Sequence, residues 1–94
     1  MTDEKLDVNN NTAESRFEIF VGHDMAFLEY KQSAGKINLM HTEVPEKLEG
    51  RGLGGKLARA AFEYAEKEQI KVMPSCPFII SYLKKHSEYR HLIV

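Results

Sequence analysis

The sequence predicts an α+β domain, an α/β hybrid in which helices pack on one mostly antiparallel sheet and the elements follow the order β-β-β-α-β-α. Three observations favour this fold class. Residues 16–44 contain three extended apolar stretches separated by two turns. Residues 52–68 repeat apolar side chains at helical spacing. A short apolar stretch at residues 70–73 then leads through prolines into a second helix at residues 77–85.

The first half of the chain predicts three antiparallel strands. Phe17, Ile19 and Val21 are spaced two residues apart, which places them on one face of a strand. Residues 22–24 and 33–35 contain glycine and small polar residues that are typical of turns. Strands joined by such short turns pair antiparallel, so this half should form a meander.

The helix predicted over residues 52–68 has a clear apolar face. Its core-facing positions recur every three or four residues; they are Leu53, Leu57, Ala61, Tyr64 and Ala65. The last three residues, 92–94, are apolar enough to dock or pair. We therefore expect the helix to lie on the sheet and the chain end to join the same core.

Length and composition predict a single domain. The chain has 94 residues with 43% hydrophobic and 29% charged residues, which is ordinary for a globular protein. Residues 1–14 are polar and predict a flexible arm, which leaves residues 15–94 as the domain. No feature of the sequence specifies an oligomeric state.

Charge and cysteine content narrow the range of partners. A formal net charge of −1 gives no field to attract nucleic acid or an anionic membrane, so neither is an expected partner. One cysteine and no long apolar span indicate a reduced, cytoplasmic setting. No metal site is expected.

The run from Glu49 to Lys56 contains four glycines and precedes the long helix, which is typical of an anion-binding turn. It fits three templates. A P-loop requires Ser or Thr after its lysine, but that position is Leu57. A dinucleotide turn follows its strand directly, whereas residues 45–49 intervene here, and residues 74–76 lack the acidic residue that should end the next strand. The third template is the coenzyme A loop of acetyltransferases.

Four segments in order carry a resemblance to a known family. They are His41-Thr42-Glu43-Val44-Pro45, Gly50-Arg51-Gly52-Leu53-Gly54, Pro74-Ser75-Cys76-Pro77-Phe78 and Tyr82-Leu83-Lys84-Lys85-His86. Their sequence and order resemble the GNAT acetyltransferase superfamily, and more narrowly its small single-domain branch of predicted N-acetyltransferases. The resemblance covers roughly residues 16–92.

The resemblance implies a compact GNAT-like fold and an acetyl-CoA-dependent N-acetyltransferase. The acetyl group would move from the thioester of acetyl-CoA to a small-molecule or protein amine by direct attack of that amine. Seven residues match the positions at which the family binds coenzyme A: Val44, Arg51, Gly52, Leu53, Gly54, Gly55 and Lys56. The family's usual Gln or Arg falls on Glu49, and a carboxylate there would repel a pyrophosphate. The alternative is therefore an acyl-CoA-binding or sensing module with little turnover.

Three residues are candidates for catalysis. His41 and Glu43 lie two apart on one strand and share a face, so either can serve as the base that takes a proton from the acceptor amine. The alternatives are a hydrogen-bonded core histidine and a solvated strand glutamate. Cys76 lies where this branch also carries a cysteine beside the thioester, and it would either accept the acetyl group as a thiolate or only shape the pocket.

Overall fold

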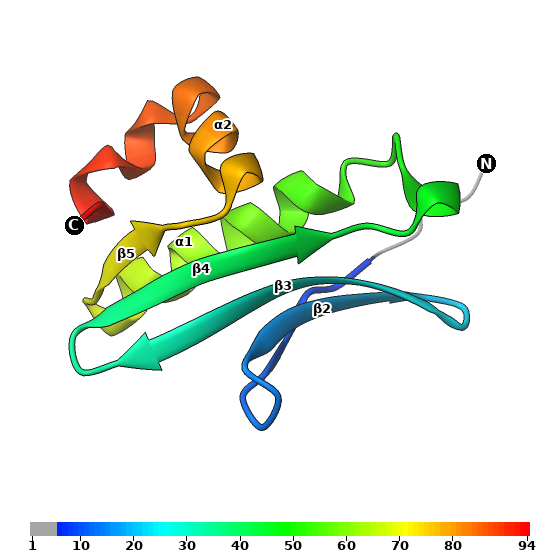
Figure 1. The fold of residues 1–94 in the computed structure, drawn as a ribbon, viewed down its shortest axis with the longest axis horizontal. Coiled ribbons are helices and arrows are strands. Elements are labelled where there is room, and N and C mark those ends of the chain that lie inside the picture. Colours follow the sequence, from blue (N-terminus) through cyan, green and yellow to red (C-terminus); the bar gives the residue numbers. More distant parts are fainter. Residues whose placement is uncertain (1–5) are drawn as a thin grey trace.

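Five strands form one sheet in which spatial order follows chain order. The computed structural model describes residues 6–94. The strands are β1 (Asn9–Asn11), β2 (Arg16–Val21), β3 (Asp24–Ser33), β4 (Lys36–Glu43) and β5 (Lys71–Pro74). The first four pair antiparallel, whereas β5 pairs parallel with β4 (Figure 1). The parallel pair requires a crossover, and the long helix supplies it.

Helix α1 (Leu53–Glu68) runs from the end of β4 back to the start of β5 and lies along one face of the sheet (Figure 1). Its buried side chains are Leu53, Leu57, Ala58, Ala61, Phe62 and Ala65. They meet the inward residues of the meander, such as Ile19, Leu28 and Ile37, which are fully buried. The predicted fold class and the predicted apolar face of this helix are confirmed.

The C-terminal part closes the core beside β5. Helix α2 (Pro77–Lys85) and the 3-10 helix η2 (Ser87–Leu92) follow it. The ring of Phe62 in α1 stacks on Tyr89 and Tyr82 with centroids 4.9 and 6.0 Å apart. Ile93 then forms a parallel bridge with Val72, and the Val94 amide donates to the Val72 carbonyl at 3.0 Å. The predicted docking of the chain end is confirmed.

Strand β1 lies within the segment for which the sequence predicts an arm, so residues 9–11 belong to the sheet instead. Polar side chains hold this strand. Tyr30 donates its hydroxyl proton to Asn10 Oδ1 at 2.7 Å, and the Asn11 side-chain amide donates to Glu18 at 2.9 Å. Backbone pairing and amide hydrogen bonds require no apolar alternation, which explains why a hydrophobic pattern does not reveal the strand. Residues 1–5 of the predicted arm lie outside the described residues.

A β-bulge changes the direction of the side chains in β4. Tyr30 pairs with Leu39 but Glu29 pairs with His41, so Met40 is an extra residue on β4. Leu39 is buried against the helices, whereas Met40 is 47% exposed. Beyond the bulge, Thr42 lies opposite the buried Leu28. The bulge therefore decides which face of the sheet each residue of the last half of β4 presents.

Candidate functional site

The last part of β4 has an unpaired edge. The register between β4 and β5 ends at Leu39 and Pro74, so beyond the bulge at Met40 residues 41–43 pair with β3 alone among the described strands. The cause is local, because the amides of Ser75 and Cys76 both donate to the Leu39 carbonyl, at 3.1 and 3.0 Å. This turns the chain out of the sheet and into α2. An exposed strand edge offers backbone groups to an extended ligand.

The glycine turn leads from the 3-10 helix η1 (Glu46–Leu48) into α1. Gly50 and Gly52 adopt φ of 86° and 74°, the left-handed region in which a side chain is strained. Gly52 is the N-cap of α1 and has no side chain with which to cap it. The first helical amides therefore receive no side-chain acceptor, and they lie at the positive end of a 16-residue helix. This is the geometry that binds anions.

Gly54 and Gly55 differ in their surroundings. A Cβ on Gly54 would lie 2.7 Å from Cζ of Phe78, whereas one on Gly55 would lie an ordinary 3.9 Å from Tyr82. Three of the four glycines thus have a conformational or packing role in the fold itself. The number of glycines alone is consequently a weaker argument for binding than the sequence suggests, and the argument for a site rests on the cavity that they line.

The glycine turn forms one wall of a cavity of about 280 Å³. Val44 and Leu48, which precede the turn, and Phe78 of α2 also line this cavity. Five of the predicted coenzyme-binding residues are brought together here: Val44, Gly52, Leu53, Gly54 and Gly55. The cavity lies directly after the unpaired edge of β4, so an extended ligand can follow the strand into the turn.

The two predicted cationic contacts are placed differently. Arg51 is exposed within the turn, between the two left-handed glycines. Lys56 instead lines another cavity of about 280 Å³, together with Asp7 and Glu63. Glu49, the residue that departs from the family pattern, lines the glycine cavity itself.

Cys76 is the N-cap of α2 and is only 4% exposed. The Thr42 hydroxyl lies 3.4 Å from its sulfur. Burial by itself raises the pKa of the thiol, but hydrogen bonding by Thr42 and by the amides of Ile79 and Phe78 outweighs it, and the pKa lies below its ordinary value. The first turn of α2 therefore favours the thiolate, as the position of the cysteine in the sequence suggests.

His41 and Glu43 lie on the other face of the sheet. His41 Nε2 is 3.0 Å from Glu43 Oε1, and the two side chains are 55% and 60% exposed. The ring of Phe27 packs edge-on to His41 with centroids 6.1 Å apart. The structure thus pairs the two candidate bases with each other, and it places Thr42 rather than either of them beside Cys76.

Two aromatic residues of α2 lie at this site: the sequence assigned no role to Phe78, and for Tyr82 the family resemblance offered only the tyrosine that protonates the departing thiolate. Phe78 covers the glycine turn through its contact with Gly54, and Tyr82 lies against Gly55. Tyr82 also stacks on His86 with centroids 4.0 Å apart, and burial raises the pKa of its hydroxyl. Both residues belong to segments that carry the family resemblance, and their helical spacing is equally typical of core packing.

No helix within residues 6–94 is long and apolar enough to cross a membrane. In the same range, the structure brings together no group of three or more His, Cys, Asp or Glu side chains suited to a metal ion.

The sheet, crossover helix and glycine turn together define a GNAT fold. A solution structure of a GCN5-like protein from Staphylococcus aureus is similar to this chain with a TM-score of 0.74 and 29% identity, over 95% of this chain and 88% of that one. Residues 16–92 match the family of GCN5-related N-acetyl-transferases, and the chain belongs to this family.

The chain is also similar in sequence to vertebrate proteins named NATD1. Protein NATD1 of Xenopus tropicalis is 38% identical over 65 residues, and protein NATD1 of Danio rerio is 32% identical over 91 residues. The Danio rerio match covers 94% of this chain and 83% of the relative. The Xenopus tropicalis match covers 68% of this chain and only 60% of the relative.

Proposed function

We propose that this protein is an acetyl-CoA-dependent N-acetyltransferase that acts on a small-molecule or protein amine. The observation that supports this most is the glycine cavity. It joins the end of the unpaired β4 edge, at Val44, to the uncapped N-terminus of α1. A ligand with an extended amide-bearing arm and a pyrophosphate matches this sequence of surfaces. Membership of the family supports the same choice.

In this proposal, residues 40–44 hold the extended arm of the coenzyme and the amides of residues 52–55 hold its pyrophosphate. When bound, acetyl-CoA supplies an acetyl group activated as a thioester. The protein's part is to orient the amine and remove its proton, since an amine with a reference pKa near ~10.4 is mostly protonated at neutral pH. The pair His41–Glu43 is suited to this step, because the imidazole can accept a proton and the Glu43 carboxylate 3.0 Å from its Nε2 can orient the ring.

Cys76 offers a second route on the opposite face. Its lowered pKa favours a thiolate, whereas its exposure of only 4% restricts approach. Direct transfer to the amine is the main proposal. Acylation of Cys76 before transfer is the variant that a Cys76→Ala substitution distinguishes, because that substitution would abolish the second route and leave the first.

Two observations favour a second function, an acyl-CoA-binding or sensing module with little turnover. Glu49 lines the glycine cavity, where it would repel a pyrophosphate, and the candidate bases are more than half exposed. Binding without turnover would show as ligand-induced stabilisation that is unaccompanied by acetyl transfer. A binding assay and a transfer assay together therefore distinguish the two functions.

The experiment compares thermal stabilisation by acetyl-CoA, ATP with magnesium, and NAD, followed by transfer of labelled acetyl groups to a panel of amines. At roughly 100 times its dissociation constant a ligand adds about 2.7 kcal/mol, which raises the melting temperature of a domain of this size by several degrees. We expect this shift for acetyl-CoA and loss of label transfer in His41→Ala or Glu43→Gln. Stabilisation by ATP alone would overturn the proposal.

Because the proposed reaction uses a coenzyme and an amine in solution, we also propose a cytoplasmic location.

A further inference from the structure

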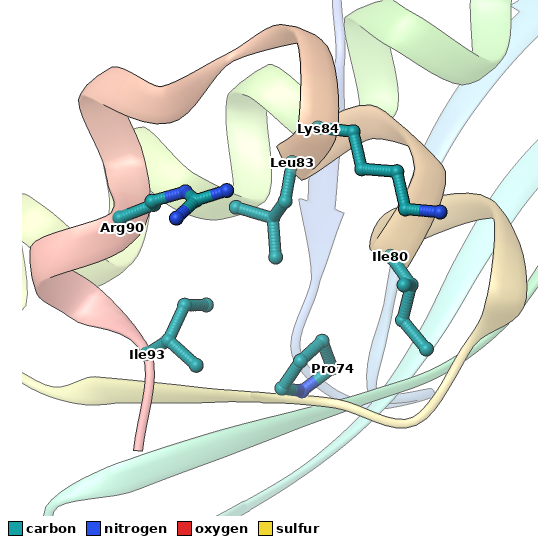
Figure 2. A pocket seen from close by; sticks show the side chains of 6 residues that line it. All are labelled: Pro74, Ile80, Leu83, Lys84, Arg90 and Ile93. Carbon is teal, nitrogen blue, oxygen red and sulfur yellow. The ribbon is translucent and has the colours of Figure 1, made fainter.

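A cavity separate from the glycine cavity lies on the far side of α2 from the glycine turn. It has a volume of about 390 Å³ and is lined by Pro74 of β5, Ile80, Leu83 and Lys84 of α2, and Arg90 and Ile93 from the chain end (Figure 2). It shares no lining residue with the glycine cavity. A volume of this size falls within the range of small-molecule pockets.

The cavity follows from the path of the chain. After β5 the chain leaves the sheet through α2, and η2 then brings Ile93 back beside Val72. The space enclosed by these three elements is walled by aliphatic side chains, and Ile80 remains 45% exposed at its rim. An exposed large apolar side chain beside a hollow apolar wall indicates a surface that a ligand can cover.

Two cations border this apolar space. Figure 2 shows the guanidinium of Arg90 directed towards Leu83, whereas the ammonium of Lys84 lies on the other side of the cavity, beside Ile80. Neither makes an ion pair within residues 6–94, whereas Arg16 and Arg59 each contact a glutamate there. The cavity thus offers two positive charges without a carboxylate partner in the described chain.

We propose that this cavity binds a small carboxylate that carries an apolar chain of medium length. The planar guanidinium of Arg90 matches a carboxylate, and Lys84 adds a second positive charge on the other side of the cavity. A monoanion suits the aliphatic walls better than a phosphate dianion, because less charge has to leave water. The proposal does not depend on the acetyltransferase activity.

The volume indicates the length of the chain. If each non-hydrogen atom takes roughly the ~30 Å³ of a water molecule in the liquid, the cavity accommodates on the order of ten such atoms. Octanoate has this size and serves as the probe.

The test is a titration of the full chain with octanoate, in which the amide chemical shifts are measured by NMR at each concentration. We expect saturable changes in the amide signals of the residues next to Pro74, of α2 and of residues 90–93. These changes should persist when acetyl-CoA is present. The double variant Lys84→Ala/Arg90→Ala should weaken binding by about tenfold, as expected for loss of charge-assisted hydrogen bonds. The exposed Ile80 permits a second variant, Ile80→Gln, which should weaken binding without unfolding the protein.

Two controls define the charge requirement. Lys85→Ala removes a neighbouring lysine that does not line the cavity and should leave binding unchanged. Octanol has the same chain without the charge and should bind about tenfold more weakly. Equal binding of octanol and octanoate, shifts confined to the glycine turn, or unchanged binding in the double variant would overturn the proposal. So would concentration-dependent shifts of these residues without ligand, since they would identify a second copy of the chain as the occupant.

Discussion

At the scale of single residues, the site is decided by a few side chains whose neighbours the sequence does not reveal. Thr42 is one of them. The bulge at Met40 turns it towards Cys76, and its hydroxyl then lies 3.4 Å from the sulfur. Glu49 is another, because it lines the cavity in which an anionic ligand is expected. Each leads to a measurable consequence.

The lowered pKa of Cys76 can be measured directly, because the chain has a single cysteine. In a pH titration followed by ultraviolet absorbance, the Cys76 thiolate should form with a pKa below the reference value of about 8.5 for a cysteine thiol. Thr42→Val should move this transition to higher pH. A group with a lowered folded pKa contributes stability above its unfolded pKa and loses it as the pH falls through the folded pKa. The stability of the native protein relative to Cys76→Ser should therefore rise as the pH increases towards about 8.5. A transition unaffected by Thr42→Val would contradict the assigned cause.

Glu49→Gln should tighten acetyl-CoA binding by about fivefold, because it removes a repulsion of about 1 kcal/mol between the carboxylate and the pyrophosphate. Isothermal titration at low and high salt is the measurement, and the gain should shrink at high salt. Glu46→Gln is the matched control, since Glu46 is exposed in η1 and does not line the cavity. An equal gain in both variants would show that the effect comes from net charge.

At the scale of elements, contacts between pieces distant in sequence determine how the site is held. Helix α2 packs its Phe78 ring onto Gly54 of α1, and this contact covers the glycine turn. Strand β1 is attached by the side chain of Glu18, which is only 2% exposed. Both arrangements depend on residue types that a hydrophobic pattern does not distinguish.

Gly54→Ala and Gly55→Ala form a matched pair. The added methyl at position 54 would meet the Phe78 ring at 2.7 Å, so the ring must move, and we expect a loss of about 1–3 kcal/mol. At position 55 the methyl has room, and the helical preference of alanine should leave stability equal or raise it by up to about 1 kcal/mol. Urea denaturation measures both. Gly54→Ala combined with Phe78→Ala should lose less than the sum of the single changes, and simple additivity would rule out the contact.

Glu18 should make the attachment of β1 dependent on pH. Burial alone raises the pKa of Glu18, but hydrogen bonds from Arg16, Asn11 and Asn9 outweigh it and the pKa lies below its ordinary value. Its contribution is therefore present above the unfolded pKa of about 4.3 and is lost as the pH falls through the folded value. Glu18→Gln should cost about 1–3 kcal/mol near neutral pH, and the difference should shrink in acid. Denaturation curves from pH 7 downwards provide the measurement, and a constant difference would refute the expected linkage.

At the scale of the whole molecule, one core extends from the meander through α1 to the chain end. The rings of Phe62, Tyr89 and Tyr82 connect α1 with η2 and α2, and the bridge from Ile93 to Val72 closes the structure beside β5. A domain of this size has about 5–15 kcal/mol of stability in total. Removal of a ring from this cluster should therefore lower the free energy of unfolding of the whole domain rather than of the C-terminal elements alone.

Tyr89→Ala should destabilise the protein by about 3–5 kcal/mol, because Tyr89 is 9% exposed and its ring stacks on Phe62. Tyr89→Phe retains the ring and should lose far less. Unfolding followed in parallel by far-ultraviolet circular dichroism and by amide signals of β2 and β3 should show one shared transition. Separate transitions for the C-terminal elements and the meander would contradict a single cooperative core.

The fold was largely predictable from local patterns. Alternation over residues 16–21 and helical spacing over residues 53–68 record which face of each element is buried, and burial of apolar surface is the main driving force of folding. The segments around His41, Gly52 and Cys76 likewise indicated the family, which the match over residues 16–92 shows. Strand β1 was not predictable in this way, because its polar residues are held by hydrogen bonds to Tyr30 and Glu18.

The sequence by itself therefore determined the order of elements from β2 to α2, their buried faces and the family, because each is specified by residues that are neighbours along the chain. Only the tertiary structure decided that Thr42 rather than His41 meets Cys76, that Gly54 is required by Phe78, and that Lys56 lies outside the glycine cavity. The physical reason is the same in each case. A one-residue bulge and the packing of two helices set these contacts, and both depend on how distant segments meet in space.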